Sequence, residues 1–155
     1  MRTSLAVKIL EANLITDKGD YLEYYERDPT DTRKEEAHQN DSAAWVTYHY
    51  PEIIFWHTVN EGKKTITQAD RDQRAGLLKG VSDNVFLNGV CYKFPFGAIE
   101  LKRVNKSGKG AASPVSKDQK EYLKRVRAAG GFAAVAYGFE QFKLAFLDMI
   151  GKQHE

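Results

Sequence analysis

The chain has 155 residues, a formal net charge of +2, 28% charged residues and a single cysteine, Cys91. A chain of this length fits one domain that buries roughly two-thirds of its unfolded surface, so it needs no cross-links to fold. One cysteine excludes an internal disulfide, as is typical of a reducing compartment, and we expect the Cys91 thiol to lie in the core.

No segment has the composition of a signal peptide or of a membrane-spanning helix. The apolar run Leu5–Leu10 near the N-terminus is short and contains Lys8. The chain also lacks any stretch of about 18 consecutive apolar residues. We therefore expect a soluble, intracellular protein of the cytoplasm with no membrane partner.

Residues 1–34 form an N-terminal arm whose structure the sequence leaves unassigned. Residues 5–15 are compatible with either a short helix or a strand, and residues 16–34 are polar and acidic. The remaining residues, 35–155, are expected to form the functional domain.

The first regular elements are predicted between the arm and residue 64. Thr32 to Tyr50 lacks Gly and Pro and ends directly before Pro51, which predicts a helix. Glu52 to His57 is rich in Ile, Phe and Trp, which is typical of a buried strand. Asn60 to Lys64 is then expected to be a turn or loop.

A helix followed by a hairpin is predicted next. Thr65 to Lys79 is polar and is expected to be helical, with Gly80 ending the helix in the left-handed conformation. Asp83 to Leu87 is predicted to be a short apolar strand. Asn88-Gly89 is a strong signal for a two-residue hairpin, so extended structure should resume at Val90.

A strand and a loop follow the hairpin. Pro95 and Gly97 are expected to interrupt the extended structure before a strand from Ala98 to Val104. Residues 105–115 contain glycines and a proline, which indicates a flexible loop. Its lysines could close over a phosphate backbone.

The C-terminal part predicts a helix, a strand and a second helix. Ser116 to Gln119 matches a capping box, and the helix that it begins should end at Gly130. Phe132 to Tyr137 is predicted to be a buried strand, and Phe139 to Ile150 a closing helix. A strand, a helix and a strand in this order imply a parallel crossover.

The expected fold is a small mixed α/β sheet flanked by helices. The closing helix is expected to face the core with Phe142, Phe146, Met149 and Ile150.

The strand from Ala98 to Val104 carries candidate chemistry on one face. Side chains alternate along a strand, so Glu100 and Lys102 share a face while Ile99 and Leu101 point into the core. With a second carboxylate from Asp83 on a neighbouring strand, this face could hold a hard divalent cation. Such an ion can activate water against a phosphodiester.

Charge is distributed unevenly along the chain. Asp17 to Glu36 contains eight acidic and four basic residues, whereas Lys102 to Arg127 contains nine basic and two acidic residues. Because the basic segment begins at the candidate site, it suits a polyanionic partner through counterion release. The alternative is a solvated helix face.

An ordered set of short segments carries a family resemblance. The set resembles the virus-type replication-repair nuclease (VRR-NUC) domain of the PD-(D/E)XK superfamily over residues 36–150. Each segment alone is unspecific, whereas their order is specific. The segments are Glu36 with Gln39, His57 to Gly62, Gly80 to Asp83, Ile99 to Lys102, and Ser116 to Gln119.

The resemblance implies a restriction-endonuclease-like mixed sheet and assigns roles to individual residues. Asp83, Glu100 and the carbonyl of Leu101 would bind Mg²⁺ or Mn²⁺. Lys102 would orient the attacking water and stabilise charge on the phosphate. Gln119 would support the site and Glu36 would approach the metal. Expected DNA contacts are Asn60, Lys63, Lys64, Arg103, Lys106, Lys109 and Lys117.

Several of these assignments have structural alternatives. Gln119 is equally well explained as the third residue of the capping box. Glu36 could be one more acid in an acidic stretch, and Asp83 could cap the end of a strand. The sequence also departs from the family pattern, because Ser82 replaces the usual proline and Asn84 replaces an apolar residue.

The histidines give no zinc pattern. His38, His49, His57 and His154 have no ligand spacing and no cysteine cluster to assist them. We therefore interpret all four as structural or surface residues, with His57 the nearest to a substrate.

The resemblance implies a structure-selective DNA endonuclease. We expect it to act on branched DNA such as four-way (Holliday) junctions, to form a homodimer, and to take part in DNA repair. A phage or prophage is one expected source. Two alternatives stay open: a non-catalytic nucleic-acid-binding module of the same fold, and a nuclease for flaps or single strands.

Overall fold

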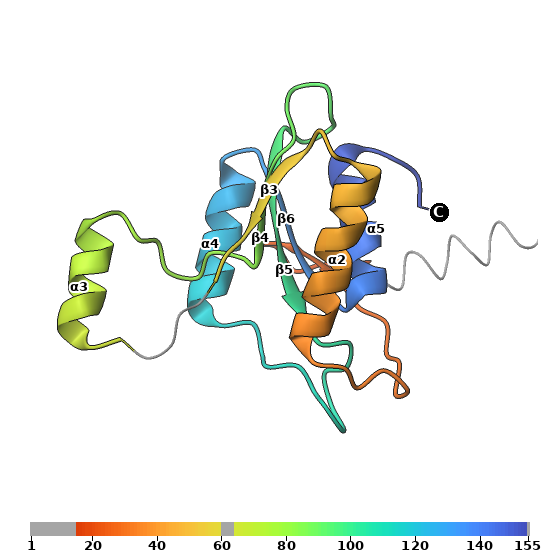
Figure 1. The fold of residues 1–155 in the computed structure, drawn as a ribbon, viewed down its shortest axis with the longest axis horizontal. Helices are drawn as coiled ribbons and strands as arrows, with labels where there is room; N and C mark the ends of the chain where they lie inside the picture. Colours follow the sequence, from red (N-terminus) through yellow and green to blue (C-terminus); the bar gives the residue numbers. More distant parts are fainter. Residues whose placement is uncertain (1–14, 60–63, 155) are drawn as a thin grey trace, which may run out of the picture.

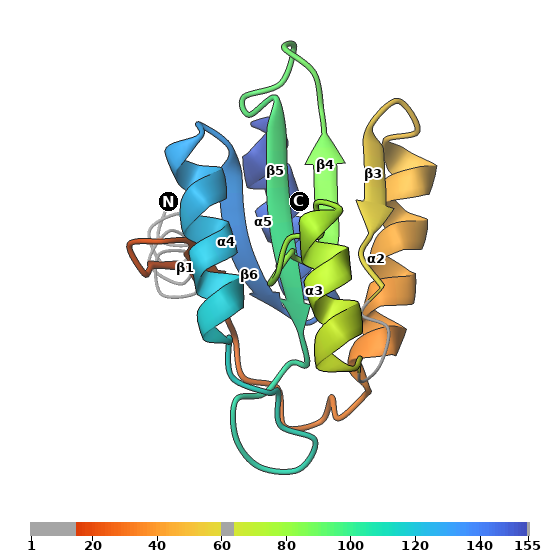
Figure 2. The same cartoon turned by 90° about the vertical axis from the view of Figure 1, so that its left-hand side faces the viewer.

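The computed structural model describes residues 15–59 and 64–154. Within these residues, six strands form one mixed sheet in the order β1-β2-β6-β5-β4-β3 (Figures 1 and 2). The strands are β1 (Ile15–Asp17), β2 (Leu22–Tyr24), β3 (Ile54–His57), β4 (Asn84–Leu87), β5 (Phe96–Lys102) and β6 (Phe132–Tyr137). The described helices are α2 (Glu35–His49), α3 (Ile66–Arg74), α4 (Lys117–Ala128) and α5 (Phe139–Ile150).

The centre of the sheet is the predicted crossover. Strands β5 and β6 are parallel and are joined through α4, and Glu100 lies opposite Val135 in their register. Strand β4 pairs with β5 in the antiparallel direction, and β3 pairs with β4 in the same way. The expected mixed sheet flanked by helices is therefore confirmed.

Two apolar layers sandwich the central strands. One layer contains Ile99 and Leu101 of β5 together with Phe142 and Phe146 of α5. The other contains Ala98 of β5 and Leu123 of α4. Full burial of each large apolar side chain contributes about 1.5–3 kcal/mol, so this packing fixes β5 between two helix layers. The predicted alternation along β5 is confirmed, and Glu100 and Lys102 lie on the α4 side.

Two short strands from the N-terminal arm belong to the same sheet. β2 pairs with β6 in the parallel direction, and β1 pairs with β2 in the antiparallel direction. Each of these strands has three residues. A period-2 pattern needs four or more residues to be visible, so the sequence leaves them unassigned.

The strand from Glu52 to His57 was expected to be buried, and this is wrong. Strand β3 lies at the edge of the sheet, where Ile54 is 62% and Trp56 47% exposed. Phe55 alone packs against the core from this strand. The reason is that α4 packs on β5 and β6, so no helix within residues 15–59 and 64–154 covers the outer face of β3.

The two-residue hairpin at Asn88-Gly89 is also wrong. Strand β5 begins only at Phe96, and the amides of Asn88 and Gly89 both donate to the carbonyl of Pro95. An eight-residue loop, 88–95, therefore connects β4 to β5. Cys91 lies in this loop and is exposed, which corrects its expected place in the core.

Helix α3 is shorter than predicted. It ends at Arg74 because Gly76 adopts a φ of 102°, in the left-handed region that favours glycine. The helix buries none of its residues and projects from the body of the molecule (Figure 1).

None of the helices within residues 15–59 and 64–154 is long and apolar enough to cross a membrane.

Candidate active site

Two carboxylates meet at the junction of β4 and β5. Asn84 pairs with Ile99 in the antiparallel register, which places the preceding residue, Asp83, opposite Glu100. The amide of Asp83 donates to Oε2 of Glu100 at 3.3 Å, and Oδ2 of Asp83 accepts the amide of Leu101 at 2.8 Å. Each acid thus hydrogen-bonds the strand of the other, and their two charges are held close together.

Burial disfavours ionisation of this pair. Removal from water raises the pKa of Glu100, and the neighbouring charge of Asp83 raises it further, while Lys102 opposes the shift. Burial also raises the pKa of Asp83, against the hydrogen bond from the amide of Leu101. A positive ion placed between the two carboxylates would remove this penalty.

Lys102 and Gln119 surround the pair. The Nζ atom of Lys102 lies 3.8 Å from Oε1 of Glu100 and donates to Oε1 of Gln119 at 3.3 Å and to Oγ of Ser113 at 3.4 Å. The side-chain Nε2 of Gln119 donates in turn to Oε1 of Glu100 at 2.6 Å. Glu100 and Lys102 are each only 3% exposed. The four side chains form one connected polar cluster.

Gln119 also completes the predicted capping box at the start of α4. Its Oε1 accepts a hydrogen bond from the backbone amide of Ser116 at 2.9 Å, and Oγ of Ser116 accepts one from the backbone amide of Gln119 at 3.1 Å. The two interpretations of Gln119 are therefore compatible, because one side chain caps the helix and contacts Glu100 and Lys102.

The third acid near the site is Glu35, and this corrects the placement expected for Glu36. The pKa of Glu35 is raised, first by burial and then by the negative charge of Asp83, whereas the side chain of Glu36 is exposed. With 3.6 residues per turn, two adjacent residues of α2 cannot face the same point. Gln39, one turn after Glu35, shares its face.

A buried amide pair fixes α2 against the sheet. The side chains of Gln39 and Asn84 exchange two hydrogen bonds, of 2.8 and 2.9 Å. Both residues are buried, so their amides depend on each other for hydrogen bonding. Asn84, which departs from the family pattern, is thus the partner that sets the register of Glu35 toward Asp83.

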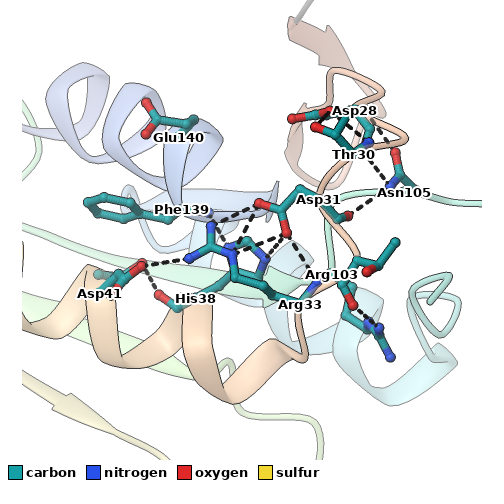
Figure 3. A network of polar contacts seen from close by, with 12 residues as sticks. Asp28, Thr30, Asp31, Arg33, His38, Asp41, Arg103, Asn105, Phe139 and Glu140 are labelled. Atoms are coloured by element: carbon teal, nitrogen blue, oxygen red, sulfur yellow. Dashed lines mark hydrogen bonds and ion pairs between the residues drawn. The ribbon is translucent and has the colours of Figure 1, made fainter. Parts of the chain in front are cut away.

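A polar network holds the chain that leads into α2 (Figure 3). Arg33 bridges Asp31 at 2.8 Å and Asp41 at 3.0 Å. The side chain of Asn105 accepts from the amide of Asp28 and donates to the carbonyls of Asp28 and Asp31 at 2.8 and 3.1 Å. The segment before Glu35 is therefore tied to the end of β5.

His38 connects the same network to α5. Its Nδ1 accepts the amide of Phe139 at 3.0 Å, and its Nε2 faces Oδ1 of Asp31 at 3.4 Å. The ring is almost fully buried, and burial lowers the pKa of His38. Because Nδ1 accepts a hydrogen bond from the Phe139 amide, the ring proton is assigned to Nε2. His38 is a structural residue, as interpreted from the sequence.

The approach of the Gly80 loop to α4 requires glycine. Gly80 has a φ of 74°, and a Cβ there would lie 2.2 Å from the carbonyl oxygen of Asp118. This contact brings the chain before Asp83 against the start of α4. Ser82, where the family pattern has proline, is buried, and its hydroxyl has no hydrogen-bond partner within the described residues.

Asp83, Glu100 and Gln119 of the cluster line an open cleft of about 550 Å³ between α3 and α4. Lys79 and the expected DNA contact Lys64 also line it, and Lys64 pairs with Asp72 at 2.6 Å. His57 is exposed beside the cluster and its Nδ1 lies 2.9 Å from the carbonyl oxygen of Asp83. The cleft is lined by Thr58, Val59, Lys64, Ala69, Gln73, Leu77, Leu78, Lys79, Gly80, Val81, Asp83, Glu100, Ser116, Asp118 and Gln119.

The other expected DNA contacts differ in their surroundings. Arg103 donates to the carbonyl of Thr32 at 2.5 Å and is half-buried, so it has a structural contact. Lys109 and Lys117 are exposed. Asn60 and Lys63 lie outside the described residues.

Lys106 is exposed, but its ammonium is held by contacts with the sheet rather than free in solvent. Its Nζ pairs with the buried Glu23 of β2 at 2.7 Å. The same ammonium lies 4.4 Å from the ring centroid of Tyr25 and 5.1 Å from that of Tyr137. The contacts hold the start of the 105–115 loop against the sheet, and the loop in turn presents Ser113 to Lys102. This argues against the predicted phosphate contact at Lys106.

We expect Lys106→Met to destabilise the protein by about 1–2 kcal/mol, because among the described residues it leaves the buried carboxylate of Glu23 with Lys18, at 4.0 Å, as its remaining ion-pair partner. Lys109→Met, in the same exposed loop, is the matched control and should leave the free energy of unfolding unchanged. Urea unfolding of both variants measures the difference. Equal midpoints would show that Lys106 does not hold the loop.

Comparison with known proteins adds two findings. The family model for the VRR-NUC domain matches residues 33–140. A solved structure described as a VRR_NUC domain protein aligns with a TM-score of 0.58 and 18% sequence identity, covering 77% of this chain and 89% of that chain. At this identity the likeness concerns the fold. No curated protein matches the chain.

Proposed function

The chain belongs to the VRR-NUC domain family and has a nuclease-type fold, and from its buried acidic cluster we propose that it hydrolyses DNA phosphodiester bonds with a divalent metal ion. The observation that carries the proposal is the pairing of Asp83 and Glu100, which line the cleft, beside Lys102. Two carboxylates with raised pKa values in a cleft are typical of a functional site rather than of a structural ion pair.

The donor set fits Mg²⁺ or Mn²⁺. Asp83 and Glu100 supply hard oxygen atoms, with Glu35 close by and the Leu101 carbonyl as a proposed further ligand. No group of three or more His, Cys, Asp or Glu among the described residues is arranged to hold a metal. Mg²⁺ usually binds one or two carboxylates together with water and substrate phosphate. When bound, the ion would activate water and polarise the scissile phosphate.

The other side chains of the cluster position the reactants. Lys102 carries its ammonium at a buried point beside Glu100, where a positive charge stabilises a phosphate more strongly than it would in water. Gln119 fixes both Glu100 and Lys102 through the hydrogen bonds given above. Glu35, at the start of α2, lies close enough to Asp83 for the two charges to interact and could help to orient a water molecule there.

We propose branched DNA, such as a four-way junction, as the substrate and a homodimer as the active form. A two-fold dimer would present two sites with the symmetry of a junction. Light scattering at the assay concentration tests the dimer, and a monomer would contradict it.

The test of the function is cleavage of labelled four-way junction, flap, linear duplex and single strand, each with Mg²⁺, Mn²⁺ or EDTA. Metal-dependent cuts placed symmetrically across the junction support the proposal. Cuts confined to flaps or single strands would change the substrate class. Binding without cuts in every condition would instead support a non-catalytic binding module.

Two adjacent glutamates of α2 provide a matched pair of variants. We expect Glu35→Gln to lower the cleavage rate about 10–100-fold, because it removes a charge that faces Asp83. Glu36→Gln should leave the rate unchanged, because that side chain is exposed on another face of the helix. Single-turnover cleavage of both variants makes the comparison, and a larger loss in Glu36→Gln would reverse the assignment.

A further inference from the structure

A row of three lysines follows one side of α4. Lys117, Lys120 and Lys124 are spaced by three and four residues, so they project from one stripe of the helix. All three are exposed, and none of them forms an ion pair with an acid within the described residues. Arg127 would continue the row, but its guanidinium donates to Asp17 at 2.9 Å and to the carbonyl of Gly19 at 2.7 Å.

The lysine row faces away from the catalytic cleft. Asp118 and Gln119 line the cleft from the first turn of α4, whereas Lys120 lines a separate pocket of about 290 Å³ on the other side. That pocket also contains Tyr21, Lys106 and Ser113. The pairing of Arg127 with Asp17 of β1 places the stripe on the β1 side of α4 (Figure 2). The lysine row and the cleft therefore lie on different sides of helix α4.

The surface near the start of α5 has the opposite charge. A pocket of about 250 Å³ there is lined by Glu26, Asp28, Asp31 and Glu140, with Arg33 held by two aspartates (Figure 3). By charge alone, this side would repel a phosphate backbone that leaves the cleft, whereas the lysine row of α4 would attract it.

We propose that Lys117, Lys120 and Lys124 bind the phosphate backbone of a second nucleic-acid segment, outside the catalytic cleft. The row spans about 10 Å along the helix axis, which matches about three nucleotide steps of one strand of a duplex. The substrate class is therefore a nucleic acid with a second arm or a strand extension that passes around the start of α4. This inference rests on the proposed function, because it presumes that the first segment occupies the cleft.

The test is the double variant Lys120→Ala with Lys124→Ala in the full chain. Alanine favours helix, so α4 should stay folded. The matched control, Lys93→Ala with Lys152→Ala, removes two exposed lysines at the other end of α5. Fluorescence anisotropy in EDTA measures affinity for a short duplex, for the same duplex with a single-stranded extension, and for a four-way junction, over a range of salt concentrations.

We expect the double variant to bind the extended duplex and the junction about tenfold more weakly. The slope of log affinity against log salt should fall by about 1.4–1.8, or 0.7–0.9 for each lost contact. The short duplex and the control should behave as wild type. An unchanged slope overturns the inference, as does an equal loss on the short duplex, which would place the row in the main binding path.

These outcomes are independent of turnover. A changed slope in a protein that never cleaves would leave the second binding surface in place and reject the nuclease proposal. Cleavage by wild type together with an unchanged slope in the double variant would support the nuclease proposal and reject the second binding surface.

Discussion

Asp83→Asn is expected to lower the rate of DNA cleavage by about 10³-fold while DNA affinity stays within a few-fold of wild type. The substitution keeps the shape of the side chain and the hydrogen bond from the amide of Leu101, but it removes the charge that the proposed metal ion needs. Because burial already raises the pKa of Asp83, the neutral amide should not destabilise the fold. Single-turnover cleavage and anisotropy in EDTA measure the two quantities.

The control is Asp118→Asn, which makes the same change in the same cleft. Asp118 lies in the first turn of α4, and its side chain has no hydrogen bond to Glu100 among the described residues. Its cleavage rate should stay within a few-fold of wild type. Full activity in Asp83→Asn would remove Asp83 from the mechanism, and an equal loss in both variants would show a general effect of cleft charge.

The parts of the fold that the sequence predicts well are those with strong local signals. The capping box at Ser116 fixes the start of α4, and the uninterrupted apolar run Phe132–Tyr137 fixes β6. The helical spacing of Phe142, Phe146 and Met149 indicates α5, and both β6 and α5 have the predicted bounds. The alternation along β5 predicts which face carries Glu100 and Lys102. In each case one pattern in the chain determines one structural feature.

The errors occur where long-range contacts decide. Asn88-Gly89 is a strong turn signal, but the carbonyl of Pro95 takes both amides and makes a longer loop. Strand β3 is apolar enough to be central, yet the sheet order places it at the edge. Neither the partner of the turn nor the neighbours of the strand can be seen within the segment itself.

The choice between Glu35 and Glu36 shows the limit at the site. The acidic pair marks the start of α2, but one residue of helix rotation decides which acid faces Asp83. The spacing of four residues between Glu35 and Gln39 indicates that both lie on the same face of the helix. The direction of that face is set by the hydrogen bonds between Gln39 and Asn84, which join residues 45 positions apart and cannot be seen in the sequence.

The second large effect expected of the cluster concerns stability and pH. In the folded protein the pKa of Glu100 is raised above its unfolded value of 4.5, mainly by burial. Above pH 4.5 the folded state therefore holds more protons than the unfolded state, and the free energy of unfolding must fall as pH rises through this window. Below pH 4.5 both states are protonated and the penalty is absent.

Glu100→Gln removes the titrating group and should stabilise the metal-free protein. In EDTA we expect no difference from wild type near pH 4 and a gain on the order of 2 kcal/mol in the free energy of unfolding at pH 8. Comparison of the two proteins at each pH cancels groups that shift the other way, such as Asp31, whose pKa is lowered by Arg33.

Added Mg²⁺ should reverse this order. A ligand that binds only the folded state stabilises it by mass action, and wild type retains both carboxylates whereas the variant retains one. Urea unfolding of wild type and Glu100→Gln at pH 4, 6 and 8, with EDTA or with Mg²⁺, measures the free energy of unfolding in each condition. A gain that is the same at every pH would show that the amide improves packing rather than removing a buried charge. A gain that persists in Mg²⁺ would mean that Glu100 does not contribute to metal binding, and the proposed catalytic role of the carboxylate pair would have to be abandoned.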